Sequence, residues 1–263
     1  MVSKLPMTVP EARKDSRLAR YPLRRVRLPM GGGTLSVVVP KGTSAMEQDL
    51  GQRGGEPPYW AQLWPAAVAI ARWVCRRGGA EGLRVLDLGC GLGLPGAAAV
   101  RCGASVTFAD FQPDALAFAG FHGRQQLECG ISPGEAGSRI CCVEHDWNSC
   151  SLPGPFDWIL MADVSYRPRH HVPILRQLRE GLSERGLAIH ADPGRRESDG
   201  FLVQLRRDYA VREIVANTHL EEERHAIRLS FAARTSEILD QWLAVRSSRA
   251  ATPQASTPKA GNQ

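Results

Sequence analysis

Short apolar runs alternate with segments of helical length from residue 84 onward. The runs RVLDLG, SVTFAD, RICCVEHD, DWILMAD and GLAIHAD begin at residues 84, 105, 139, 157 and 186. Helices are expected in PGAAAVRC (95–102), over 113–129 and over 170–182. Apolar strands that alternate with helices are typical of a parallel sheet covered on both faces.

The two ends of this series differ from its middle. Residues 24–42 read as two short strands around Gly31-Gly32-Gly33, and a helix is expected from about Pro65, because proline suits a first helical turn. The last apolar runs, VREIVANTHL and HAIRLSFAA, are separated only by the charged turn 221–224, which requires an antiparallel pair. The sequence therefore predicts an α/β, Rossmann-like, doubly wound and mostly parallel seven-stranded sheet. It ends in an antiparallel hairpin and carries an N-terminal hairpin extension.

The length of 263 residues fits one domain. We expect a folded domain over 21–246, with an N-terminal hairpin at 23–42 and a core at 57–246. Residues 1–20 are expected to be a flexible basic arm and 247–263 a disordered tail, because both contain too few apolar residues to offset the entropy of ordering.

Net charge and cysteine content restrict the partners, metal sites and cellular location that we expect. The net charge of +6 suggests nucleic acid, but residues 1–30 carry that whole excess and the remaining 233 residues are formally neutral. We therefore expect no nucleic-acid partner. The seven cysteines show no C-x-x-C spacing and indicate neither a disulfide framework nor a zinc site. We therefore expect no bound metal. The absence of a disulfide framework favours a cytoplasmic protein. No apolar run reaches the roughly 18 residues of a membrane span. An organellar transit peptide is the alternative for the Arg-rich start.

A glycine-rich loop follows the first strand of the series. Asp87, Gly89, Gly91 and Gly93 spell D-x-G-x-G-x-G. The same loop contains G-x-G-x-x-G, the dinucleotide fingerprint, with Asp110 placed to hold a ribose. Asp87 beside the loop would repel a pyrophosphate but could bind, directly or through water, a ligand with an ammonium group. The loop therefore favours S-adenosylmethionine, which has an ammonium, a sulfonium and no phosphate.

Four segments resemble the class I, or seven-β-strand, S-adenosylmethionine-dependent methyltransferases. They are PYWAQLWPAA (within 57–67), LDLGCGLGLPG (86–96), DWILMADVSY (157–166) and ADPGR (191–195). The chain is most similar to the group with the lysine methyltransferase of the electron-transfer flavoprotein β-subunit and the predicted nicotinamide N-methyltransferases. The glycine loop is generic to the superfamily, whereas the Trp-Pro segment and the D-x-x-Y sequence are more specific to this group. The resemblance covers roughly residues 57–235.

The resemblance implies a set of donor-binding residues around the loop. Asp110 would bind the ribose hydroxyls, Asp146 and Trp147 would lie at the adenine, and Trp64 would turn an aromatic face to the sulfonium. Each of these residues also has a purely structural alternative. Asp110 could cap the next helix, Asp146 could be a loop acid, and Trp147 could be a core residue. Trp64 could form a hydrophobic staple for the helix that follows it. The predicted cofactor-binding residues are Trp64, Asp87, Gly89, Gly91, Gly93, Asp110, Asp146 and Trp147.

Asp163 and Tyr166 of the D-x-x-Y sequence are the predicted catalytic residues. They follow a strand, where catalytic groups of doubly wound sheets gather. Methyl transfer needs a neutral amine in line with the methyl carbon, and a carboxylate alone would raise the pKa of that amine. We expect Asp163 to orient the amine and Tyr166 to form an aromatic wall, with Asp192-Pro193-Gly194-Arg195 as a turn on the cleft rim. A strand-end cap and a core tyrosine are the alternatives.

These predictions describe a monomeric N-methyltransferase that uses S-adenosyl-L-methionine. The favoured acceptor is the side-chain amine of a protein lysine. A small, nicotinamide-like amine is the main alternative. An NAD-binding oxidoreductase and a non-catalytic donor-binding module are less favoured hypotheses.

Overall fold

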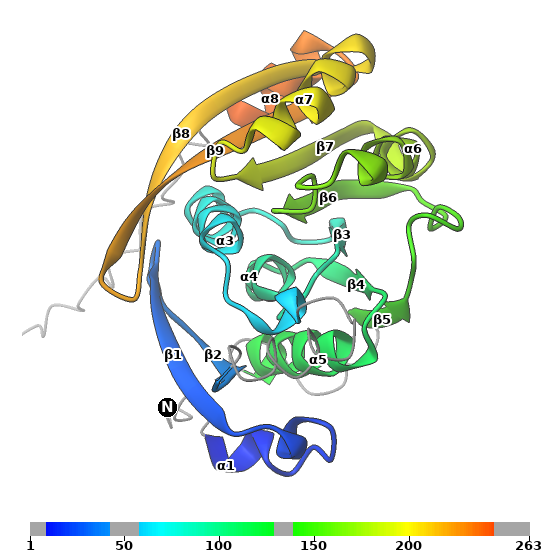
Figure 1. Cartoon of the computed structure of the whole chain (residues 1–263). Coiled ribbons are helices and arrows are strands. Elements are labelled where there is room, and N and C mark those ends of the chain that lie inside the picture. Colours follow the sequence, from blue (N-terminus) through cyan, green and yellow to red (C-terminus); the bar gives the residue numbers. More distant parts are fainter. Residues whose placement is uncertain (1–8, 43–57, 129–138, 245–263) are drawn as a thin grey trace, which may run out of the picture.

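The computed structural model describes residues 9–42, 58–128 and 139–244, and its main element is a seven-stranded sheet (Figure 1). The strand order is β5-β4-β3-β6-β7-β9-β8. Five strands are parallel: β3 (Arg84–Leu88), β4 (Ser105–Asp110), β5 (Ile140–Glu144), β6 (Phe156–Ala162) and β7 (Leu182–Asp192). β9 (Glu223–Ala233) lies antiparallel between β7 and β8 (Ala210–Leu220). The predicted fold class is confirmed.

Helices cover both faces of the sheet (Figure 1). α3 (Pro65–Arg77), α4 (Leu94–Arg101), α5 (Pro113–Glu128) and α8 (Ser236–Leu243) share one apolar core, while α6 (His171–Gly181) and α7 (Arg196–Asp208) share the other. Successive strand residues point to opposite faces, so Val85 belongs to the first core and Leu86 to the second. Burial on both faces explains why the run from Trp158 to Ala162 in β6 is continuously apolar.

α7 and α8 were not among the helices expected from the sequence. α7 buries only Phe201, Leu202 and Leu205 of its apolar residues, among charged neighbours. Such a narrow apolar stripe gives a weak periodic signal.

The N-terminal hairpin, a separate two-stranded sheet, touches the terminal hairpin of the seven-stranded sheet. β1 (Leu23–Met30) and β2 (Gly33–Pro40) pair antiparallel around Gly31-Gly32, which confirms the predicted N-terminal hairpin. The terminal hairpin turns on Glu221 and Glu222 alone, so the expected four-residue turn is two residues long. Arg24 of β1 forms an ion pair with Glu221, and the Arg72 guanidinium donates hydrogen bonds to the carbonyls of Pro29 and His219.

The described part of the segment before β1, residues 9–22, packs on the domain. α1 (Val9–Ala12) and the 3-10 turn η1 (Leu18–Arg20) each bury one side chain completely, Ala12 and Leu18. The guanidinium of Arg20 and the hydroxyl of Tyr21 both contact the Asp114 carboxylate. Asp114 begins the first turn of α5, where a carboxylate is favoured. Residues 1–8 and the predicted tail 247–263 lie outside the described residues.

Candidate active site

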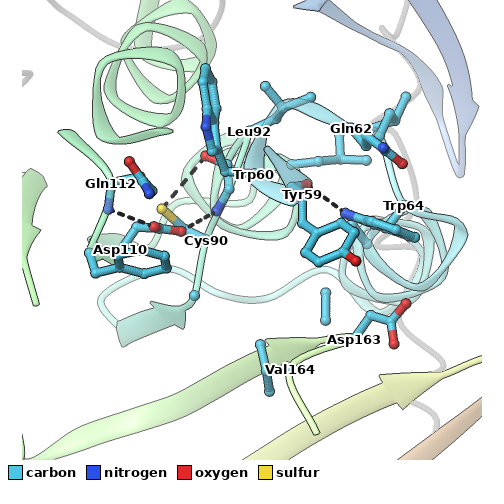
Figure 2. A pocket seen from close by; sticks show the side chains of 18 of the residues that line it. Tyr59, Trp60, Gln62, Trp64, Cys90, Leu92, Asp110, Gln112, Asp163 and Val164 are labelled. Carbon is cyan, nitrogen blue, oxygen red and sulfur yellow. Dashed lines mark hydrogen bonds between the residues drawn. The ribbon is translucent and has the colours of Figure 1, made fainter. Parts of the chain in front are cut away.

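A cleft opens at the carboxyl ends of β3, β4 and β6 (Figure 2). Its described walls come from the segment before α3 (59–64), the glycine loop (89–94), the residues after β4 (110–112), Trp147 after β5, and the residues after β6 (162–166). Figure 2 shows Asp110 and Cys90 toward one end, with Tyr59, Trp64 and Asp163 toward the other. We call these the donor end and the acceptor end.

The glycine loop forms the floor of the donor end. Gly91 has φ of 50° and Gly93 has φ of 71°, a left-handed conformation that side chains with a Cβ rarely adopt. A Cβ on Gly91 would lie 3.2 Å from the Trp60 carbonyl oxygen, and a Cβ on Gly93 would lie 2.5 Å from the Cβ of Ala119. The loop is thus enclosed between the segment before α3 and α5, with no room for a side chain at Gly91 or Gly93.

Asp110 ties the loop to the end of β4. Its Oδ2 accepts a hydrogen bond from the Gly91 N–H at 2.9 Å, and its Oδ1 accepts one from the Gln112 N–H at 2.9 Å. Burial raises the pKa of this carboxyl, and the backbone hydrogen bonds work in the opposite direction. Asp110 lines the cleft, as a ribose-binding acid would.

Asp87 lies outside the described lining of the cleft, contrary to its expected place beside the ligand. Its side chain shares the face of β3 that carries Val85, so it points beneath α4. There its Oδ2 accepts a hydrogen bond from the Gly96 N–H at 2.8 Å. Burial, with a smaller contribution from the negative charge of Asp110, raises the pKa of Asp87 to about 8.

The two predicted adenine residues separate in space. The Trp147 ring lies against Gly89, 2.8 Å from where a Cβ would stand, and lines the cleft. Asp146 is exposed and is absent from the described lining, because its carboxylate accepts a hydrogen bond from the Asn148 N–H at 2.9 Å within its own turn. Trp147 is therefore available to a ligand at this position, whereas Asp146 caps a loop.

Aromatic rings line the acceptor end. Tyr59 contacts both Trp64 and Tyr166 edge to face, with ring centroids 6.0 Å and 5.9 Å apart. The Trp64 Nε1–H donates a hydrogen bond to the Tyr59 carbonyl at 2.9 Å, which fixes the ring that faces the cleft. Asp163 lies beside these rings, and its carboxylate is paired with Arg195. The structure thus brings together the predicted residues Trp64, Asp163 and Tyr166.

Three features of the site were not predicted from the sequence. Phe111 lines the cleft and is 52% exposed, although nothing in the sequence distinguishes it from a core phenylalanine. Gln112 lines the cleft beside it. The pairing of Arg195 with Asp163 joins residues 32 positions apart, a separation that no local pattern reports.

The charge of the described lining is informative. It contains two carboxylates, Asp110 and Asp163, and neither lysine nor arginine. A pyrophosphate would find no cation in these walls, whereas a ligand with an ammonium and a sulfonium would meet carboxylates and aromatic faces. The residues present therefore fit S-adenosylmethionine better than a dinucleotide.

Comparison with known families agrees with this chemistry. A family model described as "Lysine methyltransferase" matches residues 46–207, more than half of the chain. The protein belongs to this lysine methyltransferase family. It is accordingly a methyltransferase whose methyl donor is S-adenosyl-L-methionine, as the sequence analysis predicted.

Curated relatives of this family member act on different atoms. The chain is 31% identical over 160 residues to the mouse protein N-lysine methyltransferase METTL21A, covering 59% of this chain and 70% of that protein. It is 32% identical to the human histone-arginine methyltransferase METTL23 (43% and 58% covered) and 31% identical to a Caulobacter ubiquinone biosynthesis O-methyltransferase (53% and 52% covered). The chain thus spans little more than half the length of the latter two.

Solved structures share the fold of this lysine methyltransferase family member. The N-methyltransferase NodS from Bradyrhizobium japonicum, in complex with S-adenosyl-L-homocysteine, superposes with a TM-score of 0.51 at 15% identity, covering 72% of this chain and 98% of NodS. A putative RNA methyltransferase from Pyrococcus horikoshii gives the same TM-score at 16% identity, covering 73% and 97%. Within the described residues, no helix is long and apolar enough to cross a membrane.

Proposed function

We propose that this methyltransferase transfers the methyl group to nitrogen, and that its acceptor is the side-chain amine of a protein lysine. The observation that carries the proposal is the arrangement of Asp163 beside the rings of Tyr59, Trp64 and Tyr166. Aromatic faces attract alkylated ammonium groups, and a carboxylate orients an amine through a hydrogen bond. The family match and the likeness to METTL21A support the same acceptor.

The donor end would hold the cofactor through backbone and aromatic contacts. Gly89, Gly91 and Gly93 let the loop pack tightly against its neighbours at the cleft floor, and Asp110 would bind the ribose hydroxyls. Trp147 would pack on the adenine, and Trp64 would face the sulfonium. We propose no contact with the cofactor for Asp87 or Asp146, because the hydrogen bonds they accept lie outside the cleft.

The acceptor end would position the amine for in-line attack. When bound, S-adenosylmethionine supplies a methyl carbon on a positively charged sulfur, which keeps the bonding electron pair when the methyl group leaves. Asp163 would orient the nitrogen lone pair toward that carbon, and Tyr59 and Tyr166 would exclude water around it. The proton of the incoming ammonium goes to solvent before the attack.

The remaining expectations about partners are part of the same proposal. We expect the enzyme to act as a monomer in the cytoplasm, on a protein rather than on nucleic acid. The even charge balance after residue 30 and the two carboxylates of the cleft lining support a protein acceptor over nucleic acid.

The test is label transfer from a tritiated methyl donor to a cell extract, separated into macromolecular and small-molecule fractions. We expect acid-stable label on protein, recovered as methyl-lysine after hydrolysis. Asp163→Asn should lower incorporation about a hundredfold, a magnitude typical of losing a positioning group. Asp157→Asn is the matched control, because Asp157 lies near the start of β6, at the opposite end from Asp163, and accepts a hydrogen bond from the Arg84 N–H.

Other outcomes would replace the proposed acceptor. Methyl-arginine, a base-labile methyl ester or label confined to small molecules would each contradict a protein lysine. Donor binding without label in either fraction would favour a non-catalytic donor-binding module. Equal incorporation by Asp163→Asn and wild type would remove Asp163 from the acceptor site.

A further inference from the structure

Asp163, the acid expected to meet the acceptor, already has a cationic partner. Both of its carboxylate oxygens accept hydrogen bonds from Arg195, Oδ1 from Nε and Oδ2 from Nη2, each at 2.9 Å. The Asp163 side chain is 7% exposed and that of Arg195 is 37% exposed. This parallel two-bond geometry is the strongest form of an arginine–carboxylate pair.

The backbone on both sides of the pair is held in place. Asp163 has φ of 54°, an unusual value for a residue with a Cβ, and its N–H donates a hydrogen bond to the Ala191 carbonyl at 2.8 Å. Two residues on, the Ser165 hydroxyl lies 2.8 Å from both His190 Nε2 and the Ser198 hydroxyl. The loop after β6 is thus anchored to β7 and α7, so the position of Asp163 does not depend on Arg195 alone.

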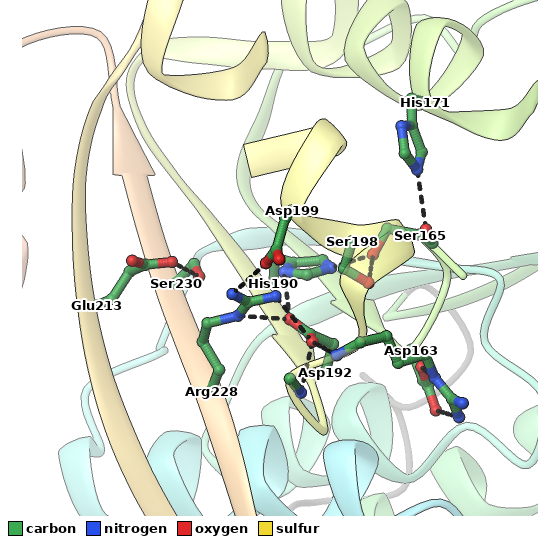
Figure 3. Close-up of polar contacts among 12 residues, drawn as sticks. Asp163, Ser165, His171, His190, Asp192, Ser198, Asp199, Glu213, Arg228 and Ser230 are labelled. Carbon is green, nitrogen blue, oxygen red and sulfur yellow. Dashed lines mark hydrogen bonds and ion pairs between the residues drawn. The ribbon is translucent and has the colours of Figure 1, made fainter. Parts of the chain in front are cut away.

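Arg195 is anchored through the buried carboxylate of Asp192. Figure 3 shows Asp192 beside Arg228 and Asp199. Asp192 Oδ1 accepts hydrogen bonds from the N–H groups of Gly194 and Arg195 at 2.7 Å and 3.0 Å. Arg228 of β9 pairs with both oxygens of Asp192 at 3.0 Å and also reaches Asp199 at 2.7 Å. The terminal hairpin therefore fixes the turn from which Arg195 extends to Asp163.

We propose that Arg195 is a positioning residue that neutralises Asp163, so that the acceptor amine binds as the free base at a lower pH than a lone carboxylate would allow. A lone carboxylate stabilises an ammonium and raises its pKa, which keeps the nitrogen protonated and unreactive. Arg195 balances that charge and leaves Asp163 able to orient a neutral amine. This inference rests on the proposed transfer to an amine.

The other charged and titratable groups around the pair do not take over this role. Tyr59 and Tyr166 face the cleft beside Asp163, while Asp192 and Glu197 lie near Arg195 and raise its pKa together with Asp163. Arg195 therefore keeps its positive charge throughout the working pH range. Among the described residues, it is the cation that contacts Asp163.

The first test measures binding of n-butylammonium, which mimics the end of a lysine side chain, to protein loaded with S-adenosylhomocysteine at pH 8. Arg195→Gln should bind butylammonium at least tenfold more tightly than wild type, because Asp163 loses its competing cation. The double variant Arg195→Gln/Asp163→Asn should return to the wild-type level. Arg196→Gln is the matched control, since it removes the same charge from the neighbouring, exposed residue.

Two further variants separate charge from folding. Arg195→Lys keeps the cation and should leave butylammonium affinity within about threefold of wild type. Unchanged affinity for S-adenosylhomocysteine in every variant shows that the donor end is intact. Butylammonium binding to Arg195→Gln that is no tighter than to wild type, including undetectable binding to both, would overturn the inference.

The second test uses the labelled protein acceptor. The midpoint of log kcat against pH, which reports groups in the enzyme–substrate complex, should rise by about one unit in Arg195→Gln and remain unchanged in Arg195→Lys. A purely structural role would lower the rate without moving this midpoint. Because the butylammonium measurement needs no acceptor, failure to find methyl-lysine would reject the proposed function while leaving this measurement interpretable.

Discussion

The two ends of the cleft hold their acids in different ways. At the donor end, Asp110 accepts hydrogen bonds from backbone N–H groups, among them those of Gly91 and Gln112. At the acceptor end, Asp163 is held by the side chain of Arg195, which depends in turn on Asp192 and Arg228. The donor end is therefore built by a loop motif, whereas the acceptor end is built by side chains brought together from β6, β7 and β9.

This difference predicts how the two ends respond to substitution. A backbone-built site tolerates changes of surface charge but not of loop geometry, because its donors and acceptors belong to the main chain. A side-chain network loses the hydrogen bonds and the charge of any member that is removed, while backbone contacts such as that of Asp163 with Ala191 remain. Variants at one end should leave the other end unaffected, and each prediction below tests that independence.

The largest effect is expected at Gly91. Gly91→Val places a branched side chain at φ of 50°, with its Cβ 3.2 Å from the Trp60 carbonyl oxygen. We expect affinity for S-adenosylhomocysteine, measured by calorimetry, to fall about a thousandfold, or roughly 4 kcal/mol. Gly82→Val is the control, since φ there is also positive (74°) but the space around it is open. Equal donor affinity in Gly91→Val and wild type would overturn the loop assignment.

The next effect concerns the acceptor end alone. Arg228→Gln leaves the wholly buried Asp192 without its paired cation, and we expect the free energy of unfolding to fall by about 3 kcal/mol in urea denaturation. Donor affinity should stay within twofold of wild type. Arg224→Gln, on the same face of the same strand but exposed, should cost less than about 0.5 kcal/mol. Loss of donor affinity in Arg228→Gln would show that the two ends are coupled.

A pH effect is expected beneath the donor end. Burial raises the pKa of Asp87 to about 8 from an ordinary 3.8, so the folded protein holds a proton that the unfolded chain releases. The stabilisation is complete below about pH 4 and is lost progressively until about pH 8, by roughly 1 kcal/mol per pH unit. Asp87→Asn, compared with wild type by denaturation at pH 5, 6, 7 and 8, should lack this decline. Parallel curves would show that Asp87 is ionised in the folded protein.

The smallest effect is expected at Tyr21, whose ring packs on Trp60 at the donor end with centroids 5.7 Å apart. Tyr21→Phe removes the hydrogen bond to Asp114 and should lower the free energy of unfolding by about 1 kcal/mol, with donor affinity changed less than twofold. Tyr209→Phe is the control, because the buried Tyr209 hydroxyl has no hydrogen-bond partner among the described residues. A neutral Tyr21→Phe would indicate that the hydrogen bond between Tyr21 and Asp114 contributes little to the stability of the domain.

Local patterns in the sequence were sufficient for most of the fold. Apolar runs of strand length predicted β3 to β7, and the short link between the last two runs predicted the antiparallel pair. α7 was not predicted, because its three buried apolar side chains are too few to give a helical hydrophobic periodicity among charged neighbours. The contact between Arg20 and Asp114 could not be predicted from the sequence, because the two residues lie 94 positions apart.

For the site, the sequence alone determined the glycine loop, Asp110 and the D-x-x-Y segment, because these features occupy fixed offsets from the ends of predicted strands. Only the tertiary structure decided which way each side chain points. The alternation of β3 sends Asp87 beneath α4, and a local turn takes up Asp146. The structure also paired Asp163 with Arg195, through a buried carboxylate held by a strand of the terminal hairpin. Strand-end position is a local property, whereas ion pairing depends on contacts between distant segments.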